Sequence, residues 1–284
     1  MITFSQIPEI RLQLKAERNA RHLVGFVPTM GFLHEGHLSL IKKAKQENDI
    51  VVLSIFVNPT QFAPSEDLDR YPRDLQHDAL LAQQAGCDIV FVPPVDEMYP
   101  SGFLSYVTVN ELSTVLEGEF RPTHFKGVTT VVLKLLNIVQ PDVAYFGQKD
   151  VQQSIILKKM IADLNLPVRI DVVPTIREAD GLAMSSRNVY LDPGQRKNAT
   201  VLHRSLLLAE TNIALGEHDP KKIVDAMTAM ILEHNPTQID YVKIVDAQNL
   251  QEKHILQSGD TIVLPLAVRF GATRLIDNII LTVK

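Results

Sequence analysis

The sequence predicts an α/β fold, in which a Rossmann-like parallel sheet with helices on both faces is followed by a smaller α+β C-terminal domain. Two observations predict this fold class. Through the first half of the chain, short apolar runs alternate with helix-like stretches, which is typical of βαβ units on a parallel sheet. Near the C-terminal end, apolar runs follow one another across short loops with no helix between them, which is typical of antiparallel strands.

The first half holds the elements that a parallel sheet requires. His37, Leu40, Ile41 and Ala44 have the i, i+3, i+4, i+7 spacing of an amphipathic helix. Helices are expected at 37–47, 74–85, 127–139 and 149–165, and strands at 24–27, 50–58, 88–94, 142–147 and 169–175. Because sheets of this kind bind ligands at the carboxyl ends of their strands, the segments that follow these strands are the places to look for a site.

The second half changes character near residue 177. Asp192-Pro193 and Asp219-Pro220 are helix-entry pairs. Helices are therefore expected at 193–215 and 220–234, and strands at 240–245, 261–268 and 274–283. This change predicts two domains, over 1–176 and 177–284.

Charge and hydropathy exclude several classes of function. A formal net charge of −5 disfavours a basic surface that tracks nucleic acid, although a pocket for a small phosphorylated ligand needs only a few local cations. The longest apolar run, 50–57, falls far short of the ~20 residues that span a bilayer. Glu9 and Arg11 stand where a signal peptide would need an apolar core. We therefore expect a cytoplasmic protein that binds neither membranes nor nucleic acid.

Cys87 is the single cysteine of the chain, so no internal disulfide can form. This fits a reducing compartment. A small buried apolar residue is the favoured interpretation of Cys87, and a reactive thiol is the alternative.

The segment PTMGFLHEGH, residues 28–37, lies between a predicted strand and a predicted helix. Its glycines allow the backbone to pass close to a ligand, and a helix N-terminus attracts anions. His34 and His37 share one side if the turn between them is helical, and imidazole can donate to phosphate oxygens. Two other interpretations remain: His37 as a core histidine, and a zinc site, although the spacing differs from His-Glu-x-x-His and no third ligand cluster is apparent.

Two further segments suit phosphate. MSSRN, residues 184–188, combines two hydroxyls with Arg187, which can bind phosphate bidentately; the alternative is a solvated turn with a helix cap. FGQKD, residues 146–150, offers Gly147 and Lys149 at a strand end, although such a lysine is more often part of a helix entry. The basic loop RPTHFKG, residues 121–127, is a further phosphate candidate, and an ordinary surface loop is the alternative. Neither a G-x-G-x-x-G fingerprint nor a P-loop is present, which argues against dinucleotide dehydrogenases and P-loop enzymes.

Taken together, PTMGFLHEGH, FVNPTQF, YPRD, RPTHFKGV, YFGQKD-x-QQ and DGLAMSSRN, in this order and spacing, resemble the pantoate–β-alanine ligase (pantothenate synthetase) family. The resemblance covers nearly the whole chain. It implies an ATP-dependent ligase that joins (R)-pantoate to β-alanine through a pantoyl-adenylate intermediate and releases pyrophosphate and AMP. It also implies a homodimer, a domain over 1–176 that binds ATP and pantoate, and a domain over 177–284 that covers the site.

The resemblance further implies the roles of individual residues. His37 and His34, together with Lys149 and Arg187, would be catalytic. The ATP site would consist of Met30, Gly31, Phe32, Leu33, His34, Glu35, Gly36, His37, Gly147, Gln148, Lys149, Asp150, Ile176, Met184, Ser185, Ser186 and Arg187. Main-chain groups near Gly147 and Ile176 would hold the adenine, Asp150 would hold the ribose, and Gln61 and Gln153 would bind pantoate.

Magnesium would accompany the ATP phosphates. The family's metal region follows YPRD and often has adjacent acidic residues, whereas this chain has Asp78 beside His77; Asp78 is therefore the expected metal ligand, on a weaker match. The proline-framed loop 60–73 is expected to act as a lid. The resembled family belongs to a wider group of nucleotidyltransferases with an HxGH-type signature. The alternatives are an AMP or CMP transferase of that group, a tRNA-directed or RNA-binding protein, and a nucleotide sensor.

Overall fold

A computed structural model describes residues 1–64 and 66–284. Ser65, in the loop expected to act as a lid, lies outside the described residues. The chain forms two compact units: unit 1 comprises Met1–Gly147 and Ile156–Pro174, and unit 2 comprises Gln148–Ile155 and Thr175–Lys284. Unit 2 thus includes a short segment, Gln148–Ile155, that precedes the boundary expected near residue 177.

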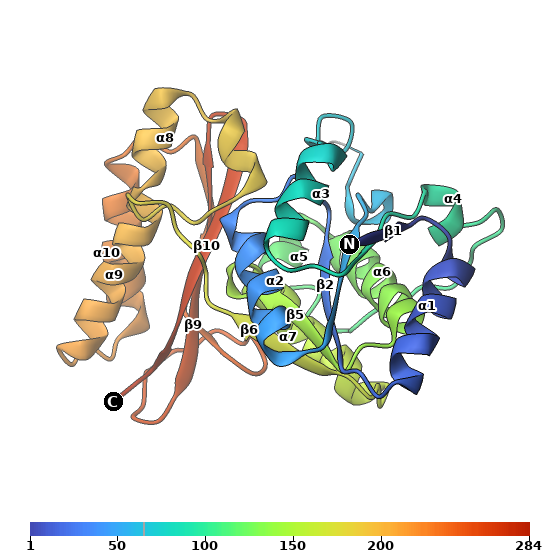
Figure 1. Cartoon of the computed structure of the whole chain (residues 1–284). Helices are drawn as coiled ribbons and strands as arrows, with labels where there is room; N and C mark the ends of the chain where they lie inside the picture. The colour runs from blue at the N-terminus through green and yellow to red at the C-terminus, as the bar shows by residue number, and fades with distance from the viewer. Residues whose placement is uncertain (65) are drawn as a thin grey trace. The chain divides into compact units, whose positions relative to one another are not determined.

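Unit 1 is built on a six-stranded parallel sheet, as the alternation of apolar runs predicts (Figure 1). The strand order is β1-β4-β3-β2-β5-β6. The strands are β1 (Ile2–Phe4), β2 (Val24–Thr29), β3 (Ile50–Ile55), β4 (Ile89–Phe91), β5 (Val143–Gly147) and β6 (Arg169–Val173). The expected strands are confirmed, with shorter bounds at 50–58 and 88–94, and β1 was not anticipated.

The order of the strands reverses between β2 and β5. From β2 the chain adds β3 and β4 on one side, and it later adds β5 and β6 on the other. In an open α/β sheet such a reversal opens a crevice at the carboxyl ends of the two central strands. The segments that leave these ends, Met30–His37 after β2 and Gln148–Asp150 after β5, are the ones expected to bind ATP.

Helices flank this sheet (Figure 1). They are α1 (Ile7–Asn19), α2 (Glu35–Glu47), α3 (Leu75–Gln84), α4 (Val95–Met98), α5 (Glu117–Phe120) and α6 (His124–Val139), with the 3₁₀ turn η1 (Pro59–Gln61). The 3₁₀ turn η2 (Gln148–Asp150) belongs to unit 2, and α7 (Val151–Asp163) begins in unit 2 and ends in unit 1. The apolar stripe of α2, which includes Leu40, Ile41 and Ala44, is buried in the core of the unit, as its spacing predicts. The helix begins two residues earlier than expected, because His34 caps it.

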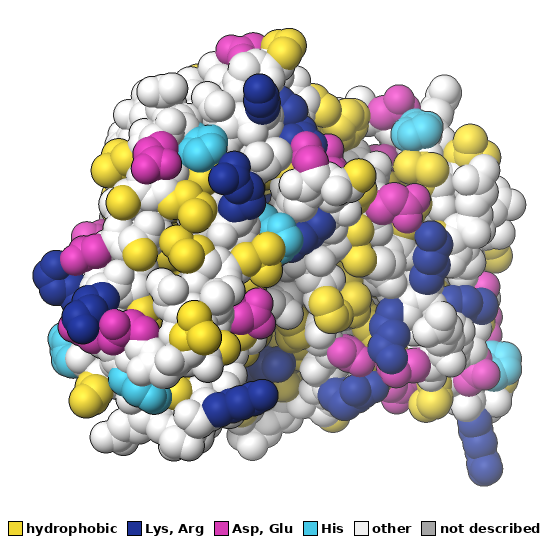
Figure 2. All heavy atoms as spheres, turned by 90° about the vertical axis from the view of Figure 1, so that its left-hand side faces the viewer, with side chains coloured by type: hydrophobic (Ala, Val, Ile, Leu, Met, Phe, Trp, Pro, Cys, Tyr) yellow, Lys and Arg dark blue, Asp and Glu magenta, His cyan; other side chains and the backbone are white. Residues whose placement is uncertain are grey.

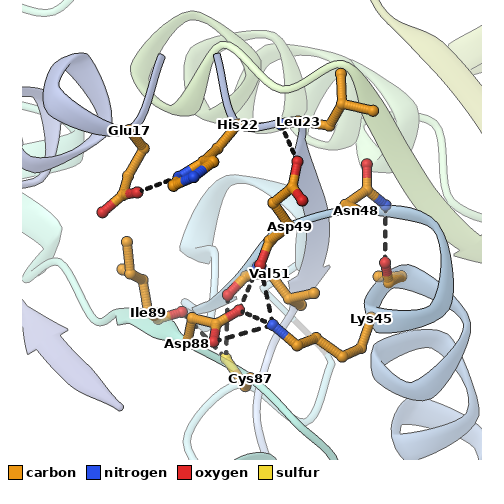
Figure 3. A network of polar contacts seen from close by, with 11 residues as sticks. Glu17, His22, Leu23, Lys45, Asn48, Asp49, Val51, Cys87, Asp88 and Ile89 are labelled. Carbon is orange, nitrogen blue, oxygen red and sulfur yellow. Dashed lines mark hydrogen bonds and ion pairs between the residues drawn. The ribbon is translucent and has the colours of Figure 1, made fainter. Parts of the chain in front are cut away.

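Aspartates secure the amino ends of the strands (Figure 3). The N–H of Leu23 donates to Asp49 at 2.8 Å, and the N–H of Val51 donates to Asp88 at 2.8 Å. Asp88 also forms an ion pair with Lys45 at 2.9 Å. These carboxylates therefore hold backbone N–H groups at the amino end of the sheet.

Cys87 lies in the same region, where it is buried and its thiol donates to the carbonyl of Ile89 at 3.1 Å. Burial raises the pKa of this thiol to about 12, so the thiol stays protonated near neutrality. The interpretation of Cys87 as a buried apolar residue is confirmed.

Unit 2 contains an antiparallel sheet in which β9 (Thr261–Phe270) lies between β10 (Thr273–Thr282) and β7 (Gln238–Val242), and β8 (Val245–Asp246) also pairs with β9. The smaller antiparallel domain is confirmed. The single strand expected at 240–245 is wrong in its bounds, because the chain forms the separate strands β7 and β8 there.

The helices of unit 2 are α8 (Pro193–Ala199), α9 (Val201–Ala214) and α10 (Pro220–Leu232), with a 3₁₀ turn η3 (Ser186–Tyr190). The single helix expected at 193–215 is wrong: it is divided at Thr200, whose hydroxyl donates to the carbonyl of Lys197 at 2.8 Å. The break is local, because Thr200 keeps right-handed backbone angles, with φ −61° and ψ −19°. On the side of the molecule seen in Figure 2, hydrophobic side chains are scattered among charged ones. Among the described residues, no helix is long and apolar enough to cross a membrane.

Candidate active site

The turn between β2 and α2 has an unusual backbone. Gly31 has a φ of +84° and Phe32 a φ of +51°, the left-handed region that glycine adopts most easily. A Cβ on Gly31 would lie 2.9 Å from a carboxylate oxygen of Asp78, so this position requires glycine on grounds of space as well.

Asp78 holds this turn from α3. One carboxylate oxygen accepts the N–H of Phe32 at 2.8 Å and the other accepts the N–H of Leu33 at 2.7 Å. The side chain is 1% exposed. Burial raises the pKa of Asp78 above its ordinary value, although the two N–H donors act in the opposite direction. The backbone that leads into His34 is therefore fixed by a buried carboxylate.

His34 and His37 form a reciprocal cap at the N-terminus of α2. Nδ1 of His34 accepts the N–H of Gly36 at 3.2 Å, and Nδ1 of His37 accepts the N–H of His34 at 3.4 Å. Since Nδ1 is the acceptor in each neutral ring, these contacts assign the proton to Nε2. The ring centroids are 4.1 Å apart. Two Nε2–H donors thus accompany the positive end of a helix dipole, a combination suited to phosphate.

The other interpretations of the two histidines fit less well. Both residues are only half-buried, which does not match a core histidine. No group of three or more His, Cys, Asp or Glu that could hold a metal occurs among the described residues, so the zinc alternative has no third ligand there.

Gln61 ends the turn η1 and is buried at 9% exposure. Its Oε1 accepts from Asn58 at 3.1 Å, and its Nε2 donates to the sulfur of Met30 at 3.0 Å. Tyr99 in turn donates to Asn58 at 2.9 Å. An amide has two N–H donors and two lone pairs, so after these contacts Gln61 retains one donor and one acceptor for a ligand.

The basic loop 121–127 supports the main chain of Gln61. Nδ1 of His124 donates to the carbonyl of Gln61 at 3.0 Å, while Nε2 of His124 lies 3.2 Å from Nη1 of Arg121 and accepts from it. Burial, and then the charge of Arg121, lowers the pKa of His124 to about 4. Burial would raise the pKa of Glu66, but its ion pair with Arg121 at 2.6 Å outweighs burial and lowers it. This loop is thus engaged in structural contacts.

A glycine brings η1 against α6. A Cβ on Gly127 would lie 2.4 Å from the carbonyl oxygen of Thr60, a contact that real structures do not tolerate. The close approach of these two elements allows Nδ2 of Asn58 to donate to the carbonyl of Gly127 as well, at 3.2 Å.

In unit 2, Lys149 lies on η2 and Gln153 in the first turn of α7. Both side chains are half-buried, whereas Asp150 is exposed. The ammonium of Lys149 forms no ion pair with any described residue. A partly desolvated cation of this kind suits an anionic ligand. Gly147, the last residue of β5, has open space where a Cβ would stand.

The segment 176–188, also in unit 2, folds back on itself. The N–H of Met184 donates to the carbonyl of Ile176 at 3.0 Å, and Ser185 caps η3 by accepting the N–H of Arg187 at 3.2 Å. Asn188 donates to Glu178 at 2.8 Å. The local geometry matches the capped-turn interpretation of MSSRN and leaves the phosphate role of these residues as a prediction.

Asp78 does not fit the role of a magnesium ligand well. Both of its oxygens accept backbone N–H groups inside the protein, whereas Mg²⁺ prefers an octahedral set that keeps several waters. The resemblance pointed to this residue, and the structure assigns it bonds that sequence patterns do not show.

Several residues around the site escaped the sequence analysis. Asn58 carried a usable signal, because an asparagine followed by proline is typical of a helix start. Two bonds in unit 2 carried none: Arg177 donates to Asp277, and Asn278 donates to the carbonyl of Gln148, and these partners are 100 and 130 residues apart in the sequence.

Comparison with known proteins places these features in one family. The family model described as "Pantoate-beta-alanine ligase" matches residues 2–280. The pantothenate synthetase of Aquifex aeolicus (strain VF5) is 54% identical over 278 residues, which cover 98% of each chain. The pantothenate synthetase of Acetivibrio thermocellus is 51% identical over the full length of both chains.

Solved structures agree. A crystal structure of pantothenate synthetase from Thermus thermophilus is similar, with a TM-score of 0.92 and 46% identity over 98% of this chain and 99% of that one. A pantoate-beta-alanine ligase from Francisella tularensis, complexed with beta-gamma ATP and beta-alanine, gives a TM-score of 0.77 and 35% identity over 98% of this chain and 97% of that one. By family match, sequence identity and fold, this chain is a member of the pantoate–β-alanine ligase family.

Proposed function

We propose that this chain carries out its ligation at the carboxyl ends of β2 and β5, with His34 and His37 on the phosphates of ATP. The chain is an ATP-dependent ligase that condenses (R)-pantoate with β-alanine to give pantothenate, AMP and pyrophosphate. The observation that carries the proposed site is the reciprocal His34–His37 cap, in which Nδ1 of each ring accepts a backbone N–H at the N-terminus of α2, so that the ring proton is assigned to Nε2.

In the first step, a carboxylate oxygen of pantoate attacks the α-phosphorus of ATP. A new O–P bond forms, the bond to the β-phosphate oxygen breaks, and pyrophosphate leaves. Nucleophile and phosphates are all anionic, so the protein must supply positive charge and fixed dipoles. In the proposal, the two histidine N–H groups and the Lys149 ammonium meet the charge that develops on the phosphates, and Ser185, Ser186 and Arg187 close around them.

In the second step, the amine of β-alanine attacks the acyl carbon of pantoyl adenylate. The C–N bond forms, the C–O bond to AMP breaks with its electron pair on AMP, and the proton lost by the amine passes to solvent as AMP leaves. Because the adenylate already has a good leaving group, the protein's main task is to hold amine and acyl carbon close together and to exclude water.

Pantoate is proposed to bind to the side-chain amides of Gln61 and Gln153. Its hydroxyls both donate and accept, as does a carboxamide. Gln61 is suited to this because Asn58 and Met30 already fix its orientation. A preorganised amide loses little conformational entropy when the ligand binds.

ATP is proposed to bind with its adenine at main-chain groups near Gly147 and Ile176 and with its ribose at Asp150. The open space above Gly147 supports this arrangement. Mg²⁺ is proposed to arrive bound to the ATP phosphates as part of the substrate. Membership of the family also supports a homodimer and a cytoplasmic location, which we propose here.

Pyrophosphate release tests the two-step reaction. Purified chain is mixed with ATP, Mg²⁺ and (R)-pantoate, with and without β-alanine. We expect up to one equivalent of pyrophosphate per site without the amine, and continuous turnover with AMP formation once β-alanine is added. Turnover that requires no amine would contradict the ligase sequence, and so would the absence of release from folded protein under either condition.

A further inference from the structure

We propose that Asp277 and Asn278, neighbours on β10, are positioning residues that fix the two segments of unit 2 from which Lys149 and Arg187 act on ATP. The inference rests on the proposed function, because the proposed function is what assigns Lys149 and Arg187 to the ATP phosphates. Asp277 and Asn278 are 2% and 1% exposed, so both act from inside the protein.

Asn278 holds the segment that carries Lys149. Its Nδ2 donates to the carbonyl of Gln148 at 3.0 Å and to the carbonyl of Lys149 at 2.9 Å. Both amide protons are therefore used on consecutive carbonyls of η2. Its Oδ1 lies 3.5 Å from Nε2 of Gln148, at the limit of hydrogen bonding. A short 3₁₀ turn has few bonds of its own, so these contacts set where the Lys149 backbone lies.

Asp277 holds the start of the segment that leads to Arg187. Nη1 and Nη2 of Arg177 donate to its two oxygens at 2.6 and 3.0 Å, a bidentate ion pair. Nη1 of Arg177 also donates to the carbonyl of Gly181 at 3.2 Å. Arg177 thus ties both ends of the turn 177–181 to one buried carboxylate.

The backbone of β10 has an unusual hydrogen bond at Asn278. Across from Asn278, β9 has Pro265, which has no N–H to give to the ladder. The N–H of Asn278 donates to Oδ1 of Asp277 at 2.8 Å. The carboxylate of Asp277 therefore bonds both to Arg177 and to the backbone of Asn278, and the two residues form one connected polar network.

This arrangement matters because cations accelerate phosphoryl chemistry only when they are held in place beforehand. A lysine side chain is long and flexible, so its mean position depends on where its backbone is anchored. Lys149 and Arg187 are far apart in the sequence, and β10 gives their segments a common rigid anchor.

The alternative is that the pair only stabilises the sheet. A second buried pair offers a matched control: Asp240 on β7, whose side chain is 0% exposed, accepts from Arg274 of β10 at 2.6 Å. It has the same chemistry in the same sheet but lies outside the 148–150 and 176–188 segments. A purely structural role predicts that changes at Asp240 and Asp277 have the same effect on rate.

The test is a double-mutant cycle on pyrophosphate release, with N278A, K149A and the combined variant, at equal folded fraction by circular dichroism. We expect K149A to slow release by roughly 10²–10³-fold and N278A by about 10–100-fold. In the K149A background, N278A should cost less than about threefold, because a residue that acts through Lys149 has nothing left to position. N278S, which keeps one donor, should fall between N278A and the unmodified chain.

A second double-mutant cycle on pyrophosphate release tests Asp277. It uses D277N, R187A and the combined variant, with D240N as the control. D240N should lower the Tm but leave the rate per folded molecule within about twofold, since the effects of distant sites are usually independent. If N278A does not fold, the cycles with N278S and D277N decide the matter.

The outcomes distinguish the role of Lys149 from the positioning role of Asp277 and Asn278. K149A with the unmodified rate would overturn both the proposed role of Lys149 and this inference. Two results would overturn the positioning role alone. In the first, K149A slows pyrophosphate release but N278A releases pyrophosphate at the unmodified rate. In the second, N278A slows release by the same factor with and without K149A. Equal rate losses in D240N and D277N would reduce the pair to a structural one.

Discussion

Asp78 and Leu33 are joined by a 2.7 Å hydrogen bond, from the backbone N–H that immediately precedes His34 to a carboxylate that is 45 residues away in the sequence. The second oxygen of Asp78 holds the N–H of Phe32, whose φ is +51°. The backbone that delivers the histidine pair is thus kept in a strained conformation by one buried side chain, and strained backbone persists only where its surroundings hold it.

Replacement of Asp78 by asparagine should therefore slow adenylation. The amide presents an N–H₂ to one backbone N–H, which costs about 1–3 kcal/mol for a buried unsatisfied donor. We expect pyrophosphate release to fall roughly tenfold to a hundredfold, with the half-saturating Mg²⁺ concentration unchanged. Release measured over a range of Mg²⁺ checks this. A shifted Mg²⁺ dependence with a normal rate at saturation would instead make Asp78 a metal ligand.

His37→Ala should remove one of the two Nε2–H donors. Loss of a preorganised donor at developing charge typically costs about 3–4 kcal/mol, so adenylation should slow by roughly 10²–10³-fold. The Gln46→Ala variant, exposed on the same helix, serves as the control. Pyrophosphate release with ATP and pantoate measures both. An unchanged rate in His37→Ala would remove the histidine from the mechanism.

Gln61→Leu should weaken pantoate binding while β-alanine is little affected. The leucine keeps the volume but loses the remaining donor and acceptor, and an unmade bond in a buried site costs about 1–3 kcal/mol. We expect the KM for pantoate to rise about 10–100-fold. Gln84→Leu, on the exposed face of α3, should leave it unchanged. Initial rates at varied pantoate decide between these results, and a normal KM for pantoate would contradict the role of Gln61.

Stability should depend on pH through His124. Its pKa is about 4 in the folded chain against about 6.5 for an unfolded histidine. Between these values the unfolded chain binds the extra proton, so stability is full above pH 6.5 and is lost as pH falls toward 4. At pH 5 the loss is about 2 kcal/mol.

Urea unfolding at pH 7 and pH 5 measures this loss. His124→Gln lacks the titrating ring. Its free energy of unfolding should therefore decrease between pH 7 and pH 5 by about 2 kcal/mol less than that of the unmodified chain. His218→Gln, at a histidine outside this loop, should follow the unmodified chain. An identical pH dependence in His124→Gln would show that His124 is not the group responsible.

Local sequence determined much of the fold. The alternation of apolar runs with helix-like stretches predicted the parallel sheet, and consecutive apolar runs predicted the antiparallel strands near the C-terminal end. The i, i+3, i+4, i+7 spacing of apolar residues predicted the helix after β2. The turn after β2 could also be predicted from the sequence. A glycine and two histidines three residues apart are local features, and the structure joins the two histidines within one helical turn. The break at Thr200 carried no such signal, because hydroxyl-to-carbonyl bonds like that of Thr200 also occur at Thr129 and Ser205 inside unbroken helices.

Only the tertiary structure decided what holds those local features in place. Asp78 lies 45 residues from Leu33, and Asn278 lies 129 residues from Lys149; no periodicity or motif connects such pairs. Their bonds join side chains to backbone groups, which carry no residue identity that a pattern can reveal. Sequence alone therefore predicted which residues have the chemistry for ATP, while packing decided which buried carboxylate and amide hold the backbone of those residues.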